Sequence, residues 1–305
     1  MEIYAKILGF MAIILVGYAA KRLGLVREQA IGWLSALVLN VTLPCTVLRG
    51  LNGVVLDPAY FALLAMGFVL NFFCLGLGRL AAGPSPLPLR GFCMINIAGY
   101  NIGMFAMAFI QSFFDASVFM VICLCDVGNA IMTMGGNYAV AARAARAPGM
   151  DARRMAKIVL LCVGFHCYVA MIVLSVLHLR LPEPVMAPVR LAAFANPYLC
   201  MFMIGLGLKF TISRKAAGIV GRILALRYAS ATLLAAGAFL LPVDRSVSAA
   251  LALFLLSPVS GLGPVYTFKL APELLNDSSM CICLSILVST AIYLVLIPSL
   301  LQYAL

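Results

Sequence analysis

Residues 96–103 read NIAGYNIG and lie in the middle of a long apolar stretch of the chain. A helix that crosses a bilayer here would carry Leu, Ile, Val and Phe, yet this segment holds asparagines, glycines and a tyrosine. A second segment, residues 257–264 (SPVSGLGP), interrupts a later apolar stretch in the same way. Two helices broken at matching places in the two halves of a membrane protein indicate a transporter's binding site.

The composition of the chain supports a membrane protein. Of its 305 residues, 65% are hydrophobic and 10% are charged, and the mean hydropathy is +1.11. A soluble domain cannot bury so much apolar surface. A span needs roughly 20 apolar residues, so with loops the length predicts roughly ten spans. We expect one integral membrane domain, residues 1–305, without a separate soluble domain.

Ten apolar stretches can be placed along the sequence. The expected spans are residues 4–20, 30–51, 57–79, 91–113, 116–141, 157–177, 185–208, 219–241, 246–268 and 278–303. If the N-terminus is outside, 16 of the 21 Lys and Arg residues fall on the cytoplasmic side, as the positive-inside rule requires. We therefore expect a multi-pass membrane protein with both termini non-cytoplasmic. The net charge of +11 then reflects topology and not nucleic-acid binding.

A weak internal repeat accompanies this pattern. A shift of 156 residues places Asn40 on Asn196, Asn101 on Ser257 and Pro86 on Pro242. The broken fourth span then falls on the broken ninth span. Since each half holds an odd number of spans, the halves (1–145 and 155–305) are expected to be inverted repeats, with the site where the broken helices meet.

Asp126 is the acidic residue that lies inside an expected span. A charge at that depth costs about 2.5–3.5 kcal/mol on insertion scales and is a functional hypothesis by default. The carboxyl group is expected to exchange a proton, bind a cation such as Na⁺ or pair with a substrate. The alternative is a carboxylate that hydrogen-bonds to neighbouring helix backbones. Asn129, three residues later, shares its helical face.

The broken segments predict a site for an anion. Glycine and proline interrupt the helix ladder, and half-helix N-termini present unpaired N–H groups and a positive dipole end. Arg222 and Arg227 are expected near the cytoplasmic end of the eighth span, where long cations reach the interface. No Lys or Arg is thus expected at the centre, so dipoles and neutral groups must bind the ligand. The alternative is close helix packing through glycine. The candidate binding residues here are Asn96, Asn101, Gly103, Ser257, Ser260 and Gly261, with breaks at Pro258 and Pro264.

Two further asparagines precede prolines inside spans. Asn40 precedes Pro44, and Asn196 precedes Pro197. Proline frees carbonyl groups, which a neighbouring asparagine can satisfy. The two asparagines are expected either to serve this structural role or to face a ligand.

Other functions find little support in the sequence. The ten cysteines lie in apolar segments without zinc-like spacing and are expected to be small buried hydrophobes, so no metal site or cofactor is expected. An intramembrane enzyme would need a metal or nucleophile set, and a single intramembrane carboxylate cannot form an aspartyl dyad. A passive channel or a membrane sensor with a transporter-like fold remains the main alternative.

Several motifs resemble the auxin efflux carrier family, which includes bacterial malonate-type permeases and the plant PIN-formed proteins. They are LNVTLP in span two, residues 101–103 in span four, CDVGN in span five, ANPYLCMFMIGLGL in span seven and SPVSG in span nine. The family is similar in fold to sodium/proton antiporters and bile-acid symporters, with crossed broken helices in spans four and nine. Plant relatives suggest a homodimer. Family members often carry Gly-x-Pro where this chain has Ala106, Met107 and Ala108, which predicts a less sharply broken fourth span.

The resemblance implies transport of a small organic anion, malonate-like or auxin-like, driven by protons, cations or the membrane potential. Together with the residues above, it predicts a secondary transporter of a mono- or dicarboxylate that works by alternating access. A scaffold with the crossing helices would move against a mobile bundle. The sequence does not indicate the substrate, the direction of transport or the coupling ion.

Overall fold

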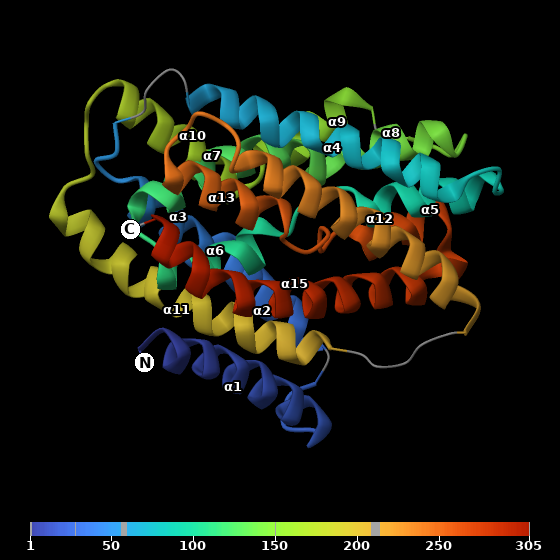
Figure 1. Cartoon of the computed structure of the whole chain (residues 1–305), viewed down its shortest axis with the longest axis horizontal. Helices are drawn as coiled ribbons and strands as arrows, with labels where there is room; N and C mark the ends of the chain where they lie inside the picture. The colour runs from blue at the N-terminus through green and yellow to red at the C-terminus, as the bar shows by residue number, and fades with distance from the viewer. Residues whose placement is uncertain (1, 28, 56–59, 150, 209–213, 305) are drawn as a thin grey trace.

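The computed structural model describes residues 2–27, 29–55, 60–149, 151–208 and 214–304. Within these residues the regular elements are helices, and the extended backbone forms one isolated bridge, between Tyr100 and Val259, and no strand. Most helices run along the long axis of the molecule (Figure 1). The expected all-helical membrane fold is therefore confirmed at this level.

Seven helices of the described residues are long and apolar enough to cross a membrane. Five are single helices: α1 (Glu2–Arg22), α4 (Phe61–Ala82), α11 (Glu183–Gly207), α12 (Arg214–Ala238) and α15 (Leu275–Ala304). Two contain a π-helical segment. The first consists of α2 (Gln29–Leu37), η1 (Val38–Thr42) and α3 (Leu43–Leu51), and the second of α7 (Ala116–Ile131), η4 (Met132–Gly136) and α8 (Asn137–Ala144), with a kink at Gly135. The predicted start of the third span, Asp57 and Pro58, lies outside the described residues.

Two further segments are discontinuous. In the first, α5 (Leu87–Ile97) is separated by residues 98–101 from η3 (Ile102–Ala106) and α6 (Met107–Phe113). In the second, α13 (Arg245–Leu255) is separated by residues 256–262 from α14 (Gly263–Leu270) and the short turn η5 (Pro272–Leu274). These breaks lie where the glycine-rich segments predicted them. The break in the fourth segment, which lacks the family's proline, is the shorter one.

The expected sixth span differs from the structure. Instead of one straight helix from residue 157 to 177, α9 (Ala152–Leu160) and α10 (Val163–Val176) meet at an angle of 74°. The reason is charge, because Arg153, Arg154 and Lys157 are exposed on α9 and cannot enter the hydrocarbon layer. The bend leaves α10 as the apolar part of this segment. The described part of the chain thus has seven candidate spans, or eight with this bent pair.

The helices pack as two groups. The flanking group consists of α1, α2, η1, α3, α10 and α11, which contact one another more than the rest. The crossing group consists of α4 to α8 and α12 to α15, and it contains both broken segments. Figure 1 shows α1 beside α11 at one edge and α4 near α12 on the other side.

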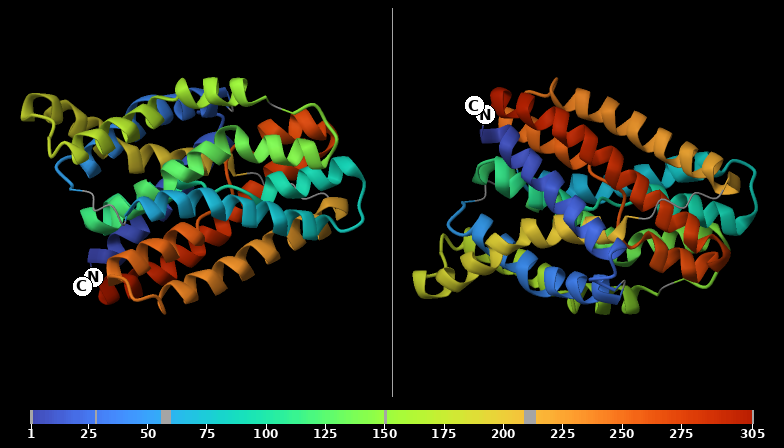
Figure 2. Two further views of the ribbon diagram at one scale, coloured as in Figure 1. Left: turned by 90° about the horizontal axis from the view of Figure 1, so that it is seen from above. Right: turned by 90° about the horizontal axis from the view of Figure 1, so that it is seen from below.

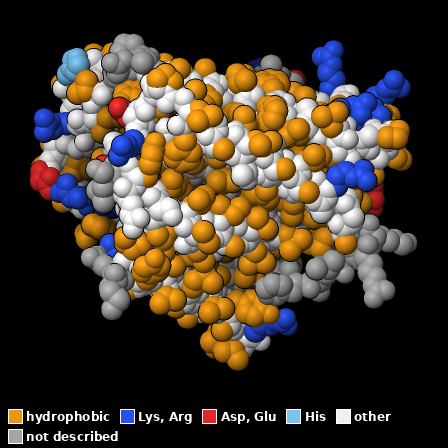
Figure 3. Space-filling view, in the orientation of Figure 1, with side chains coloured by type: hydrophobic (Ala, Val, Ile, Leu, Met, Phe, Trp, Pro, Cys, Tyr) orange, Lys and Arg blue, Asp and Glu red, His pale blue; other side chains and the backbone are white. Residues whose placement is uncertain are grey.

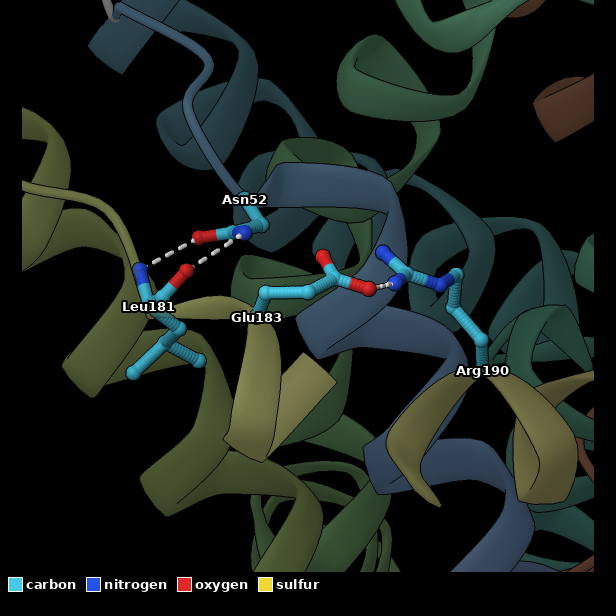
Figure 4. A network of polar contacts seen from close by, with 4 residues as sticks. All are labelled: Asn52, Leu181, Glu183 and Arg190. Carbon is cyan, nitrogen blue, oxygen red and sulfur yellow. Dashed lines mark hydrogen bonds and ion pairs between the residues drawn. The ribbon is translucent and has the colours of Figure 1, made fainter. Parts of the chain in front are cut away.

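A polar contact joins the ends of the flanking helices (Figure 4). The Asn52 side chain after α3 accepts a hydrogen bond from the Leu181 backbone N–H at 2.7 Å and donates to the Leu181 carbonyl at 3.3 Å. Nearby, Arg190 forms an ion pair with Glu183 on α11. The end of α3 is thereby fixed to the segment that begins α11.

The surface fits a bilayer. Figure 3 shows hydrophobic side chains over the middle of the visible face and charged side chains toward its ends. Both chain termini lie at the same end of the molecule in Figures 1 and 2. This arrangement defines a multi-pass membrane protein, while the side of the membrane that the termini occupy remains a prediction.

Glycines bring pairs of helices into close contact. A Cβ atom at Gly17 of α1 would lie 2.2 Å from the Phe202 carbonyl oxygen of α11, and one at Gly205 would lie 2.0 Å from the Ile14 carbonyl oxygen. Because both obstacles are backbone atoms, no side chain can move aside. The contact between α1 and α11 therefore requires glycine at both positions.

Gly17→Ala is expected to destabilise the protein by about 1–3 kcal/mol, because the added methyl group forces the two helices apart. Thermal unfolding of the purified protein measures the change. Gly9→Ala on the same helix is the matched control, since a Cβ atom there meets nothing within 4 Å. Equal melting temperatures for the two variants would contradict the close contact.

Candidate functional site

The two broken segments cross at the centre of the molecule. Tyr100 and Val259 form an antiparallel backbone bridge, and the Asn101 N–H donates to the Pro258 carbonyl at 2.9 Å. Gly99 has a φ of 79°, and a Cβ atom there would lie 2.7 Å from the Ser260 Cβ atom. Only glycine fits this turn without strain, so the NIAGYNIG segment is shaped by its contact with the SPVSGLGP segment.

Arg227 of α12 binds both sides of this crossing. Its side chain is 1% exposed, and its guanidinium donates to the carbonyls of Ile97 at 3.1 Å and Ser257 at 3.5 Å. The guanidinium also lies 3.9 Å from the centre of the Tyr100 ring. The expectation that Arg227 reaches a membrane interface is wrong. A buried cation occupies the centre because the carbonyls at the ends of α5 and α13 offer it a partial negative charge.

Two side chains hold the extended backbone of the crossing. Asn129 accepts a hydrogen bond from the Tyr100 N–H at 3.1 Å and donates to the Tyr100 carbonyl at 2.9 Å. On the other segment, the Ser285 hydroxyl of α15 accepts from the Val259 N–H at 2.9 Å. Backbone groups that a helix break leaves unpaired are thus satisfied. Asn129 was a candidate only because it shares a helical face with Asp126, and the sequence analysis missed Ser285.

Asp126 is buried within a polar chain on the same face of α7. Its carboxylate accepts hydrogen bonds from Asn129 at 2.9 Å and from the Tyr168 hydroxyl of α10 at 2.8 Å. Asn71 of α4 donates to Asn129 at 3.3 Å and accepts from Asn137 at 2.9 Å. The hydrogen-bond partners of the Asp126 carboxylate are thus the side chains of Asn129 and Tyr168, and not the backbones of neighbouring helices.

Asn96 lies apart from this chain and is fully enclosed. Its amide donates to Thr267 of α14 at 3.0 Å and to the Phe92 carbonyl at 2.9 Å, and its oxygen accepts from Ser278 of α15 at 2.5 Å. With its amide occupied by protein groups and 1% exposed, Asn96 joins α5 to α14 and α15. The structure gives it a packing role.

A cavity of about 200 Å³ adjoins the crossing. Asn101 and Gly261 line it together with Ser35 of α2 and apolar side chains such as Met104 and Ile282. Within the described part of the chain, the Asn101 side-chain amide has no hydrogen bond, and it does not cap η3. The cavity therefore holds a free amide beside the first N–H groups of a half-helix.

The other predicted residues of the crossing serve its geometry. The Ser257 hydroxyl donates to the Phe254 carbonyl at 2.7 Å, and Ser260 accepts from the Leu262 N–H at 3.3 Å. Gly103 lies against Leu43, where a Cβ atom would be 2.7 Å from a methyl group. Pro258 supplies the carbonyl that Asn101 binds, and Pro264 lies in the first turn of α14.

The proline-containing helices of the flanking group, α3 and α11, contact each other away from the crossing. Asn196 on α11 is fully buried and accepts a hydrogen bond from Thr42 of η1 at 2.8 Å. Asn40 is exposed and donates to the Ala36 carbonyl of its own helix at 2.8 Å. Pro44 lies in the first turn of α3, directly after η1, and Pro197 lies inside α11. The structure brings neither asparagine to the cavity at the crossing.

The described residues contain no group of His, Cys, Asp or Glu that could hold a metal ion. Sequence reasoning missed Asn71, Tyr168, Arg227 and Ser285. Asn71 and Arg227 carried a signal, since each is a polar residue inside an apolar stretch. Tyr168 and Ser285 carried none, because Tyr and Ser are common in membrane helices.

The fold and this polar, discontinuous centre define a multi-pass membrane protein with the features of a transporter. A family model described as "Membrane transport protein" matches residues 2–154, about half of the chain. The chain belongs to this family, the auxin efflux carrier family of membrane transporters. No curated protein matches the chain significantly.

Arg227→Gln is expected to destabilise the protein by about 1.5–3 kcal/mol, because hydrogen bonds from a charged donor to buried carbonyls are lost. Thermal unfolding and the rate of Cys74 alkylation measure the effect, since the guanidinium also contacts the Cys74 sulfur at 3.0 Å. Arg222→Gln on the same helix is the control, because Arg222 is exposed and its hydrogen bond, to the Ala81 carbonyl at 3.2 Å, does not involve the broken segments. A variant that melts like the wild type and keeps Cys74 protected would show that the guanidinium does not hold the crossing.

Proposed function

We propose that the protein is a secondary active transporter that moves a small mono- or dicarboxylate across the cytoplasmic membrane by alternating access. The observation that carries the proposal is the free Asn101 amide in a cavity at the crossing of two broken helices. Membership of a transporter family supports the general function. The substrate class rests on the chemistry of the cavity.

The cavity favours an anion with an apolar body. The first N–H groups of η3 have no acceptor within the helix, and the dipole there is positive. A carboxylate at this end would accept hydrogen bonds from these groups and from the Asn101 amide. The remaining walls are largely apolar, and a volume of about 200 Å³ suits a small organic acid. Arg227 adds positive charge behind the crossing without lining the cavity.

A ten-span inverted repeat accounts for the roles of several residues. The offset of 156 that relates the two halves also places Asn71 on Arg227 and Asn129 on Ser285. Asn129 and Ser285 perform the same task, since each binds the backbone N–H of the bridged residue in its own half. We propose that the broken segments are the fourth and ninth of ten spans, in a protein of the bacterial inner membrane with both termini non-cytoplasmic.

Asp126 is proposed to couple transport to H⁺ or another cation. It lies in the crossing group, while its partner Tyr168 lies in the flanking group. It also binds Asn129, which holds the Tyr100 backbone next to Asn101. A proton or cation on the carboxylate would weaken its acceptance of both hydrogen bonds. The same event would loosen the contact between the two groups and shift the backbone beside the substrate.

Asp126→Asn is expected to abolish proton- or cation-coupled uptake without loss of expression, because the amide can neither release a proton nor carry a charge. Uptake of a radiolabelled carboxylate into proteoliposomes, with and without a pH or sodium gradient, measures this. Asp277→Asn is the control, since Asp277 lies in the first turn of α15 and away from the crossing. Unchanged transport with unchanged pH dependence would exclude the coupling role.

Asn101→Ala is expected to lower carboxylate uptake by about tenfold or more, the amount that one lost hydrogen bond to a charged group represents. The same proteoliposomes measure it, and Asn276→Ala at an exposed position of α15 controls for general effects. Counterflow distinguishes a carrier from a channel, because a channel shows no accelerated exchange. Full uptake by the Asn101 variant would argue against the cavity as the substrate site.

A further inference from the structure

A second cavity lies near the end of the molecule that carries the chain termini. It has a volume of about 490 Å³ and lies between α1, α3, α6 and α11. Its polar lining residues are Lys6, Arg49, Gln111 and Ser112, and its walls include Phe10 and Phe194. A smaller cavity of about 140 Å³ shares Arg49 and Gln111 with it. We refer to the larger one as the terminal cavity.

The side-chain amide of Gln111 has no hydrogen-bond partner within the described part of the protein. Both polar atoms of its side chain, Nε2 and Oε1, are shielded from solvent and have no hydrogen-bond partner. A buried amide in this state costs roughly 1–3 kcal/mol per unpaired group, so each such group in a folded protein requires an explanation, such as a bound water or ion. Because Gln111 lines both cavities, a rotation of its side chain would turn the amide toward a partner in this space.

Arg49 is one of two cationic residues that line the terminal cavity, the other being Lys6. Its guanidinium lies 4.3 Å from the centre of the Phe194 ring, and among the described residues it forms no ion pair. Arg190, by contrast, is paired with Glu183 (Figure 4). Asp115 lines the smaller cavity, but its carboxylate is used at the start of α7, where it accepts from the Val118 N–H at 3.2 Å.

One helical segment connects the terminal cavity to the cavity at the crossing. The segment η3–α6 contributes Asn101 and Met104 at its start to one cavity, and Gln111 and Ser112 at its end to the other. Between them lie the rings of Phe105, Phe109 and Tyr293, all fully buried. Phe109 packs against Phe105 at 5.0 Å and against Phe10 of α1 at 5.1 Å between ring centres. A layer of aromatic rings thus separates the two cavities along one helical segment.

We infer that the terminal cavity is a second binding site, for a carboxylate attached to an aromatic or other compact apolar body. The carboxylate would bind the Arg49 guanidinium and the Gln111 amide, and the apolar body would lie between Phe10 and Phe194. The place of this site on the transport route, beyond the aromatic layer from the crossing, rests on the proposed function. The binding of the anion itself does not.

The test uses benzoate and benzamide, which have the same shape and differ in charge. Isothermal titration calorimetry with the full-length protein in nanodiscs compares their affinities for wild type and for Arg49→Gln, Gln111→Leu and Arg245→Gln. Arg245 is the matched control, because it also lies over an aromatic ring, that of Tyr303 at 5.4 Å, but lines neither cavity. The Asn101→Ala background removes the contribution of the crossing.

Benzoate is expected to bind and benzamide to bind at least about tenfold more weakly. Arg49→Gln is expected to lower the affinity for benzoate by about tenfold and to leave the affinity for benzamide unchanged. Gln111→Leu is expected to lower the affinity for benzoate, while the melting temperature of the protein stays at or above that of the wild type. The control variant should bind benzoate normally. Equal affinity for benzoate and benzamide, or benzoate binding unaffected by both cavity variants, would overturn the site. If decanoate binds and benzoate does not, the assignment of the site to a carboxylate with a compact apolar body would be overturned.

Uptake separates this inference from the proposed function. If no carboxylate is transported but benzoate binding still depends on Arg49, the site stands and the transport proposal fails. If carboxylates are transported and Arg49→Gln changes neither uptake nor benzoate binding, the transport proposal stands and the site fails.

Discussion

The structure depends on one buried cation at the point where two broken helices cross. The ends of α5 and α13 leave carbonyl groups unpaired in the middle of the protein, and unpaired carbonyls in an apolar interior are costly. Arg227 satisfies carbonyls of both segments and stacks on Tyr100. In many transporters half-helix C-terminal ends and unwound carbonyls coordinate a Na⁺ ion. Here a side chain of α12 supplies the positive charge.

This fixed charge explains how the two sides of the crossing can differ. On one side Arg227 holds the C-terminal ends of the first half-helices. On the other side the Asn101 amide and the start of η3 face a cavity. Both sides favour negative partners, which are the carbonyls in one case and, in the proposed function, an anionic ligand in the other. The guanidinium need not touch a substrate to favour an anion, because in a low-dielectric interior its field extends beyond its contacts.

The sequence predicted the breaks but not the residue that joins them. Glycine and proline in NIAGYNIG and SPVSGLGP are local signals, so the positions of the breaks and of Asn101 followed from the chain alone. The bend before α10 was missed because hydropathy does not register an angle. Arg227 was misplaced because its distance from a span end is about two turns, which fits both a snorkelling and a buried side chain. Asn40 and Asn196 looked equivalent in sequence, yet Asn40 is exposed and Asn196 is buried. This difference depends on how the helices pack, which the sequence does not indicate.

The contact between Asp126 and Tyr168 has a consequence for how the two helix groups can move. Most polar side-chain contacts of the crossing, including those of Arg227 and Asn129, remain within the crossing group. The hydrogen bond from Tyr168 to Asp126 joins that group to the flanking group. Relative motion of the groups would then preserve the crossing as a unit and break the bond that depends on the charge of one carboxylate. A change of protonation or cation binding at Asp126 would act on the boundary where alternating access requires movement.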